Sequence, residues 1–160
     1  MFPKRLALSS AKYLVYLTGL STYALIVWGG YTTLGGYGLG CGNYWPSCNG
    51  MLLPTADWSA IVEYVHRVLT IVTGILLLIG TVAVWRLRPR PIGAFRLLLL
   101  AIGLLIVQSL LGGDVVFTNL EPVVTTMHLA YGTAVFAIVV LACGLMYSRD
   151  KTRAGQSSQV

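Results

Sequence analysis

Four long apolar stretches decide what this chain can fold into. They cover about residues 13–33, 60–85, 95–116 and 123–147, and each is long enough to cross ~30 Å of hydrocarbon. Unpaired strand backbone cannot face lipid, so we expect each stretch to be a helix. Only 10% of the residues carry charge, which excludes an ordinary soluble domain. We therefore predict an all-α integral membrane protein whose residues 1–160 form one domain, a bundle of four transmembrane helices.

The basic residues predict the orientation of this bundle. Ten of the eleven fall on one side, which the positive-inside rule makes cytoplasmic together with both termini: Lys4, Arg5, Lys12, Arg86, Arg88, Arg90, Arg96, Arg149, Lys151 and Arg153. The loop of about residues 35–59 is then extracytoplasmic, and 148–160 form a solvated cytoplasmic tail. Because topology accounts for the net charge of +6, we expect a lipid bilayer and no nucleic acid as partner.

The first apolar stretch is expected to stay in the mature protein. It follows basic residues as a signal peptide does, but it is long and no small-residue cleavage site closes it. No transit-like extension precedes it, so we expect a multi-pass protein of the plasma membrane.

The outer loop carries two cysteines, Cys41 and Cys48, in a C-x6-C spacing. This spacing matches neither the C-x-x-C of thioredoxin-like redox sites nor a complete zinc set. On the oxidising side of a membrane it is compatible with a structural disulfide, a redox-active pair or two free thiols. The third cysteine, Cys143, is expected to pack as a small apolar residue.

The segment from Glu63 to Arg67 concentrates charge near the start of the second helix. Glu63 and Arg67 are four residues apart, in the favourable order for a helical ion pair. Taken alone, they predict a solvated structural pair, and His66 between them is an ordinary polar residue near the membrane interface.

The second histidine, His128, changes this interpretation. His66 and His128 each lie about six residues into a helix that runs from the outside to the inside, so we expect their imidazoles at equal depth. Ionisable groups inside membrane helices are costly and usually functional. Two histidines at one depth in a helical bundle are typical of a bis-histidine heme, whereas zinc needs about four ligands. Gln108, at membrane depth in the third helix, is expected to hydrogen-bond across helices or to contact the ligand.

A weak internal repeat supports a shared site. Gly29-Gly30 ends the first helix and Gly112-Gly113 lies near the end of the third, and each pair is followed by a helix that carries a histidine. Two such hairpins, related by a pseudo-two-fold axis, aim both histidines at one centre. We expect the glycines to make room there for a macrocycle.

Several motifs follow one another over nearly the whole chain: the Gly29–Gly40 stretch, Cys41 and Cys48 around Trp45-Pro46, Glu63 to Arg67, Gln108 to Gly113, and Pro122 to Leu129. In this combination the chain resembles the heme A synthase family. The resemblance implies oxidation of a ring methyl of heme O to a formyl group, which gives heme A for terminal oxidases.

The resemblance also implies residue roles. His66 and His128 would be axial ligands of the heme iron, Glu63 the catalytic carboxylate, and Cys41 and Cys48 a disulfide near the heme. Arg67, like Gln108, is expected to help bind the cofactor, and the arginine either pairs with Glu63 or holds a heme propionate.

One departure from the family pattern affects the expected assembly. The usual member has eight helices in two halves with two histidine pairs, whereas this chain has one half and one pair. We therefore expect a homo-oligomer, at least a dimer, whose heme sites hold heme b, substrate heme O or each in different copies. Heme O synthase and a quinone or other electron acceptor are expected as further partners.

Three other functions stay open at this point. A b-type cytochrome needs the histidines but gives Glu63 and the cysteines no chemistry. A membrane thiol-disulfide oxidoreductase usually needs a second cysteine pair as a relay. A structural or assembly subunit needs no cofactor.

Overall fold

The computed structural model describes residues 4–157, which form four long helices. These are α1 (Lys4–Leu34), α2 (Trp58–Arg86), α3 (Ile92–Phe117) and α4 (Pro122–Ser157). All four are long and apolar enough to cross a membrane. The predicted all-α fold of four helices that are able to span a membrane is therefore confirmed.

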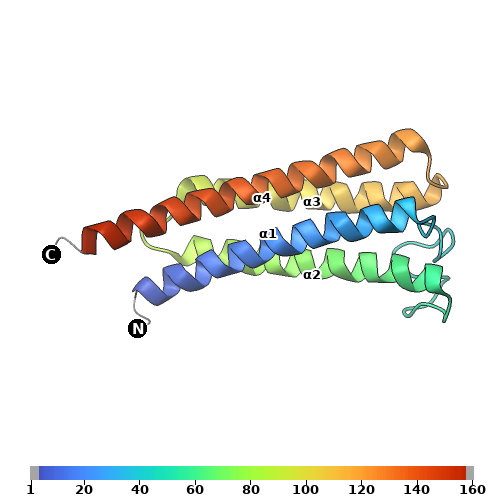
Figure 1. Ribbon diagram of the computed structural model, residues 1–160, viewed down its shortest axis with the longest axis horizontal. Coiled ribbons are helices and arrows are strands. Elements are labelled where there is room, and N and C mark those ends of the chain that lie inside the picture. The colour runs from blue at the N-terminus through green and yellow to red at the C-terminus, as the bar shows by residue number, and fades with distance from the viewer. Residues whose placement is uncertain (1–3, 158–160) are drawn as a thin grey trace.

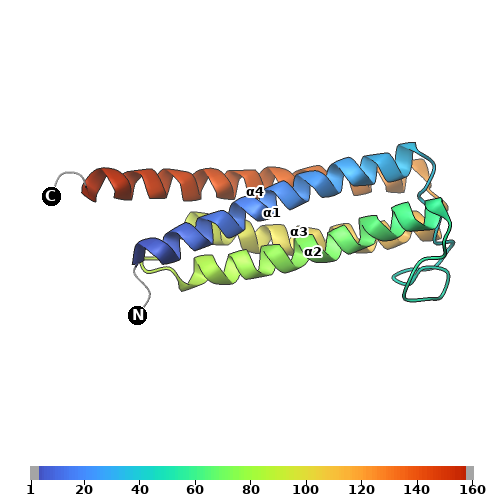
Figure 2. The ribbon, with the colours of Figure 1, turned by 60° about the horizontal axis from the view of Figure 1, so that its bottom comes forward.

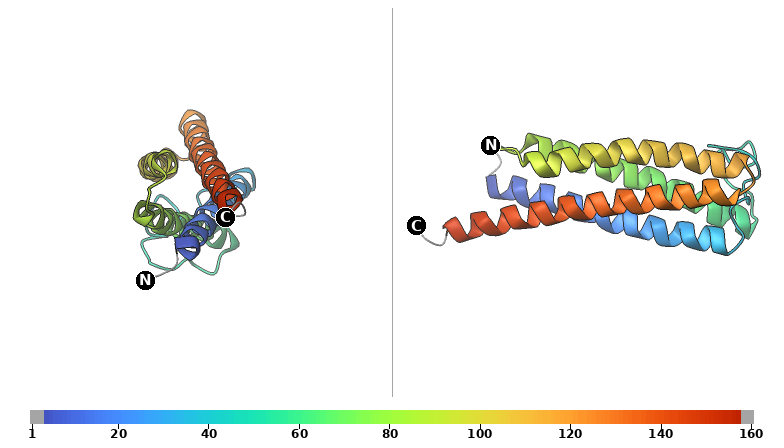
Figure 3. Two further views of the ribbon diagram at one scale, coloured as in Figure 1. Left: turned by 90° about the vertical axis from the view of Figure 1, so that its left-hand side faces the viewer. Right: turned by 90° about the horizontal axis from the view of Figure 1, so that it is seen from above.

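The helices run alternately up and down, and both ends of the chain lie at one end of the bundle (Figure 1). Around the bundle, α1 packs on α2 and α4, and α3 packs on α4 and α2. Among the described residues, no close backbone approach joins α2 to α4, so these two helices are diagonal neighbours across the bundle, as the end-on view of Figure 3 shows. The histidine-bearing helices thus face each other across the bundle axis.

The hydrophobic core fills the half of the bundle near the termini, here called the inner half. It contains residues of all four helices: Leu8, Ala11, Val15, Leu77, Val84, Leu87, Ala94, Leu98, Ala101, Leu105, Val135, Val139, Ala142 and Met146. In the opposite, outer half, α4 has no buried residue before Val135. The outer part of α4 is therefore packed less closely on the bundle than its inner part.

Two helices extend beyond their predicted bounds. The first begins at Lys4 rather than near residue 13, and the fourth continues to Ser157 instead of ending at 147, so most of the expected tail is helical. Hydropathy marks the segment that contacts lipid, whereas a helix can continue into water. At the inner end Lys12 forms an ion pair with Asp150, which ties these extensions of α1 and α4 together. The bounds of α2 and α3 agree with prediction within three residues.

The long connection between α1 and α2 lies over the outer end of the bundle (Figure 2). Asp57 caps α2, because its carboxylate accepts a hydrogen bond from the Ala60 backbone N–H at 3.1 Å. This cap sets where α2 begins, and so the height at which its polar residues stand.

Candidate heme site

The two histidines lie in the outer half at similar depths. His66 follows the first residue of α2, Trp58, by eight residues, and His128 follows the first residue of α4, Pro122, by six. Measured from the helix starts, their depths differ by about 3 Å. Both side chains are half-buried. The structure thus places the predicted pair on parallel, diagonal helices within the same layer of the bundle.

Each imidazole lies against a glycine of the preceding helix. A Cβ at Gly29 would come within 2.8 Å of His66 Cε1, and one at Gly112 within 3.1 Å of His128 Cε1. The expected hairpin repeat is therefore present in the packing. Gly29 and Gly112 make room for the histidine rings, whereas a Cβ at Gly30 would meet nothing within 4 Å. That the glycine pairs make room for a macrocycle stays a prediction.

His128 forms two contacts with Gln108 of α3. Its Nδ1 lies 3.1 Å from the backbone carbonyl oxygen of Gln108, and its Nε2 lies 3.3 Å from the side-chain nitrogen of the same residue. Gln108 therefore bonds across helices, which was one of the two roles expected for it. The tight contact of its amide with Gly132, where a Cβ would lie 3.0 Å away, was not signalled by the sequence.

Several polar atoms around the histidines are buried without a hydrogen-bond partner. They are His66 Nδ1, Gln108 Oε1 and Thr125 Oγ1, and all belong to the outer half. Buried polar atoms are normally satisfied, so such atoms indicate a ligand-binding site. Among the described residues, no group of three or more His, Cys, Asp or Glu side chains could hold a bare metal ion. Two imidazoles in one layer of the bundle fit a heme instead, since its ring supplies the other four nitrogen ligands.

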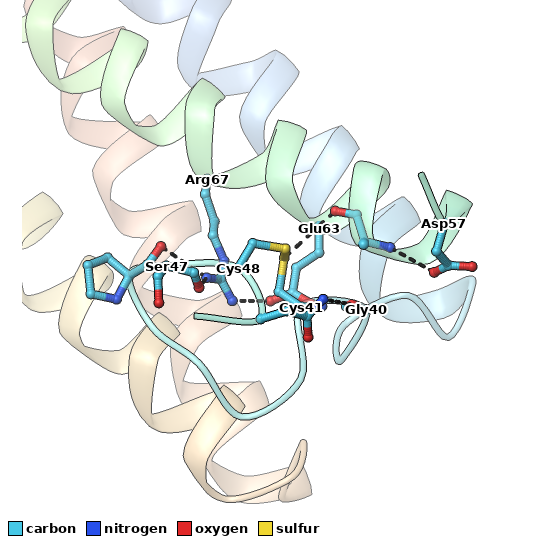
Figure 4. Close-up of a disulfide and its surroundings, with 10 residues drawn as sticks. Gly40, Cys41, Ser47, Cys48, Asp57, Glu63 and Arg67 are labelled. Atoms are coloured by element: carbon cyan, nitrogen blue, oxygen red, sulfur yellow. Dashed lines mark hydrogen bonds and ion pairs between the residues drawn. A yellow bond between two sulfur atoms is a disulfide. The ribbon is translucent and has the colours of Figure 1, made fainter. Parts of the chain in front are cut away.

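Glu63 is buried, with 4% of its surface exposed, and both carboxylate oxygens have partners. Oε2 accepts a hydrogen bond from the Cys41 backbone N–H at 2.9 Å, and Oε1 pairs with Arg67 (Figure 4). The sequence predicted the helical ion pair, but as a solvated one. The structure shows that the loop covers it.

Arg67 also holds the outer loop. Its guanidinium donates hydrogen bonds to the carbonyl oxygens of Pro46 and Ser47, next to Cys48. Together, Glu63 and Arg67 form a clamp that fastens the cysteine loop onto α2. In this arrangement the Arg67 guanidinium contacts Glu63 and the loop carbonyl oxygens. Of the two partners expected for it, the structure has Glu63.

The two loop cysteines are joined by a disulfide and are fully buried. The structure therefore has the bridged form and not two free thiols, while a structural disulfide and a redox-active pair are both compatible with it. The loop before the bridge packs tightly on α2, because a Cβ at Gly40 would lie 2.2 Å from the Ser59 backbone carbon. That approach brings the Cys41 N–H to the Glu63 carboxylate.

The loop also reaches the second hairpin. The Trp45 ring lies against Gly113 of α3, where a Cβ would be 3.1 Å from its Cδ2, and Leu120 lies against Gly38. These contacts were missed from the sequence, since a glycine shows no partner until the fold is known. The loop therefore covers the outer end of both hairpins.

We expect the double variant Cys41→Ser/Cys48→Ser to fold but to lose about 2–3 kcal/mol of stability, the effect of opening a short disulfide loop. The Glu63–Arg67 clamp still holds the loop, which limits the loss. Thermal unfolding of the purified protein in detergent measures it, with Cys143→Ser as the matched control. An unchanged unfolding temperature in the double variant would contradict a stabilising bridge.

Comparison with known proteins gives a consistent set of relatives. A family model described as COX15-CtaA, cytochrome oxidase assembly protein, matches residues 56–159. Heme A synthase of Bacillus licheniformis is 29% identical over 150 residues, which are 91% of this chain and 48% of that protein. Heme A synthase of Geobacillus kaustophilus is 30% identical over 144 residues, 89% of this chain and 45% of the relative.

A third relative is heme A synthase of Symbiobacterium thermophilum, 34% identical over 119 residues, 72% of this chain and 38% of that protein. The chain thus spans about half the length of the curated relatives it matches, or less. No solved structure matches it.

Proposed function

The chain belongs to the COX15-CtaA family of cytochrome oxidase assembly proteins, and we propose that it works as a heme A synthase. In this proposal it oxidises a ring methyl of heme O to the formyl group of heme A. The observation that supports this most is the histidine pair in one layer of the bundle, each ring in a glycine cradle, with a buried carboxylate one turn outward from His66. Several heme A synthases among its relatives agree with this proposal.

The site residues take distinct roles in this proposal. His66 and His128 would hold the iron and so fix the plane of the macrocycle. Glu63 lies three residues before His66 on the same face of α2, about 4.5 Å outward along the axis. Its carboxylate is placed to accept a proton lost from the substrate methyl, or to stabilise positive charge that develops there. Gln108 would position His128.

Arg67 has a supporting role. It holds Glu63 in place and fastens the loop that covers the outer end of the bundle. The proposed reaction adds the oxygen of one water to the methyl carbon and releases electrons and protons. When bound, heme b supplies electron transfer, and a quinone or another acceptor must finally take the electrons.

The histidine count suggests how a second heme is supplied, because these 160 residues carry two histidines. One copy offers a single histidine pair, so we propose that a second copy of the chain brings another and that the active form is at least a dimer. Heme O synthase is then the expected source of the substrate. We further propose that the protein lies in the plasma membrane with its basic end in the cytoplasm and its disulfide loop outside.

A b-type cytochrome is the second candidate, and one observation favours it. Both Glu63 oxygens are already bound by the protein, so a purely structural role accounts for their contacts. The thiol oxidoreductase lacks comparable support, because Cys143 packs in the inner half against the Val15 carbonyl oxygen and offers the loop cysteines no relay.

Extraction of the bound heme separates these functions. The full chain is produced in cells that make heme O but lack any other heme A synthase, and the heme is extracted and identified by mass. We expect heme A or its alcohol precursor, and neither from a His66→Ala/His128→Ala control. Heme b alone, bound without conversion of heme O, would identify a cytochrome and overturn the synthase.

A further inference from the structure

We propose that the two histidines are unequal ligands: His128 anchors the heme, and His66 is the ligand that exchanges. The inference rests on the proposed heme site and deepens it. It follows from differences between two sites that the hairpin repeat makes otherwise alike.

The anchoring role of His128 begins with Gly112. Because this residue has no side chain, the imidazole lies directly on the backbone of α3. There His128 Nδ1 lies 3.1 Å from the backbone carbonyl oxygen of Gln108. A carbonyl only accepts hydrogen bonds, so Nδ1 must carry the proton and donate it. Nε2 then carries the free lone pair, which is the form that binds a metal, and the donated hydrogen bond makes it a stronger ligand.

The side chain of Gln108 holds the same ring from its other nitrogen. Its amide nitrogen lies 3.3 Å from His128 Nε2 and is lodged against Gly132 of α4. The His128 ring is therefore oriented by hydrogen bonds at both nitrogens before any ligand arrives. Binding of iron at Nε2 requires only the Gln108 amide to give way, while the ring stays in place. Gln108 is thus a positioning residue.

His66 has the same cradle without the hydrogen bonds. Its Cε1 and Nδ1 lie 2.8 Å and 3.4 Å from where a Gly29 Cβ would be, yet Nδ1 is buried and has no partner. Four residues before Gly29, where α3 has Gln108 before Gly112, α1 has the apolar Leu25. Nothing in the described contacts fixes the tautomer or orientation of His66. We infer that it is the weaker iron ligand and the easier one to displace.

This inequality suits a site through which heme must pass. A synthase has to take in heme O and release heme A in every cycle, whereas an electron-transfer site keeps its heme. If one ligand detaches first while the other still holds the iron, the macrocycle can enter and leave from the α2 side.

The test measures heme release. The purified full chain in detergent is loaded with hemin, and transfer to excess apomyoglobin is followed by absorbance. Second-sphere bonds to a ligand are worth about 10–100-fold in metal affinity. We therefore expect His128→Ala to release hemin at least about tenfold faster than His66→Ala. The His66→Ala protein should keep hemin in a high-spin state that added imidazole returns to low spin.

A glycine pair provides matched variants that keep both ligands. Gly112→Ala shifts the His128 ring by a few tenths of an ångström and so weakens its hydrogen bond to the Gln108 backbone carbonyl, and we expect faster release than in the wild type, by up to about tenfold. Gly29→Ala moves His66 instead, although its contact is the tighter one, and we expect a smaller change than in Gly112→Ala.

The outcomes separate the two proposals. Equal release from the two histidine variants, and from the two glycine variants, would overturn the inequality while leaving the heme site in place. A wild-type chain that takes up no hemin would overturn the proposed function and this inference together.

Discussion

Replacing Glu63 with glutamine is expected to lower heme A formation per bound heme by at least about hundredfold, the lower end of what a positioned acid or base contributes. Glutamine keeps the length of the side chain and one oxygen that can accept the Cys41 N–H, while its NH2 group replaces the oxygen that accepts from Arg67. Arg67 still holds the loop through the carbonyl oxygens of Pro46 and Ser47. What glutamine loses is the negative charge and the ability to take a proton. Heme should remain bound, because His66 and His128 are unchanged.

Alanine at Glu63 is expected to be equally inactive but also less stable. It leaves the Arg67 guanidinium buried without its carboxylate and the Cys41 N–H without an acceptor. Removing one partner of a buried ion pair costs about 3–5 kcal/mol. The difference between the two variants separates chemistry from packing, with heme content and product both measured by extraction.

Arg67→Ala tests whether Glu63 matters only as part of the clamp. It loosens the loop but keeps the carboxylate, so we expect a smaller loss of product than in Glu63→Gln. Glu121→Gln is the matched control: its carboxylate lies at the same outer end and accepts a hydrogen bond from the Val124 N–H at the start of α4. A Glu63→Gln protein that makes heme A at the wild-type rate would show that the carboxylate is structural.

The second large effect is expected at Gly40. In Gly40→Ala the new Cβ would overlap the backbone of Ser59 and Ala60 at 2.2–2.5 Å, where no side-chain rearrangement relieves it. The loop must move away from α2, and the hydrogen bond from Cys41 to Glu63 is lost with it. We expect a loss of about 3 kcal/mol or more, at the upper end of single substitutions, and little heme A.

Thermal unfolding and limited proteolysis of the loop measure the effect of Gly40→Ala. Gly38→Ala is the control, because the Cβ there meets only the end of the flexible Leu120 side chain. A Gly40→Ala protein with wild-type stability and an uncut loop would mean that the loop does not depend on this approach.

The sequence predicted the features that follow from the hydrophobicity and length of its apolar stretches. Four apolar stretches in a chain with few charges leave only helices, and the bounds of α2 and α3 follow from their length. The histidine pair was found because ionisable residues are rare in such helices. The start of α1 and the end of α4 were missed, since hydropathy marks only the membrane segment, whereas the helix continues beyond it.

The loop shows why the rest could not be predicted. Glu63 and Arg67 satisfy the helical spacing rule, but their burial depends on backbone groups of Cys41, Pro46 and Ser47, which carry no sequence signal. Gly40 matters because of one backbone approach that only the folded loop creates. Contacts made by main-chain atoms are specified by the path of the chain, and the path is what sequence patterns describe least.

The uneven packing of the bundle has a consequence for the order of assembly. The inner half has a core built from all four helices, whereas the outer half of α4 buries nothing before Val135. The helices can therefore associate in the membrane while the outer half still awaits its ligand. By mass action, a ligand that binds only the folded outer half stabilises it by an amount that grows with the logarithm of the free ligand concentration. With the proposed heme as that ligand, the delivery of heme, and not the synthesis of the polypeptide, would set when the outer half matures.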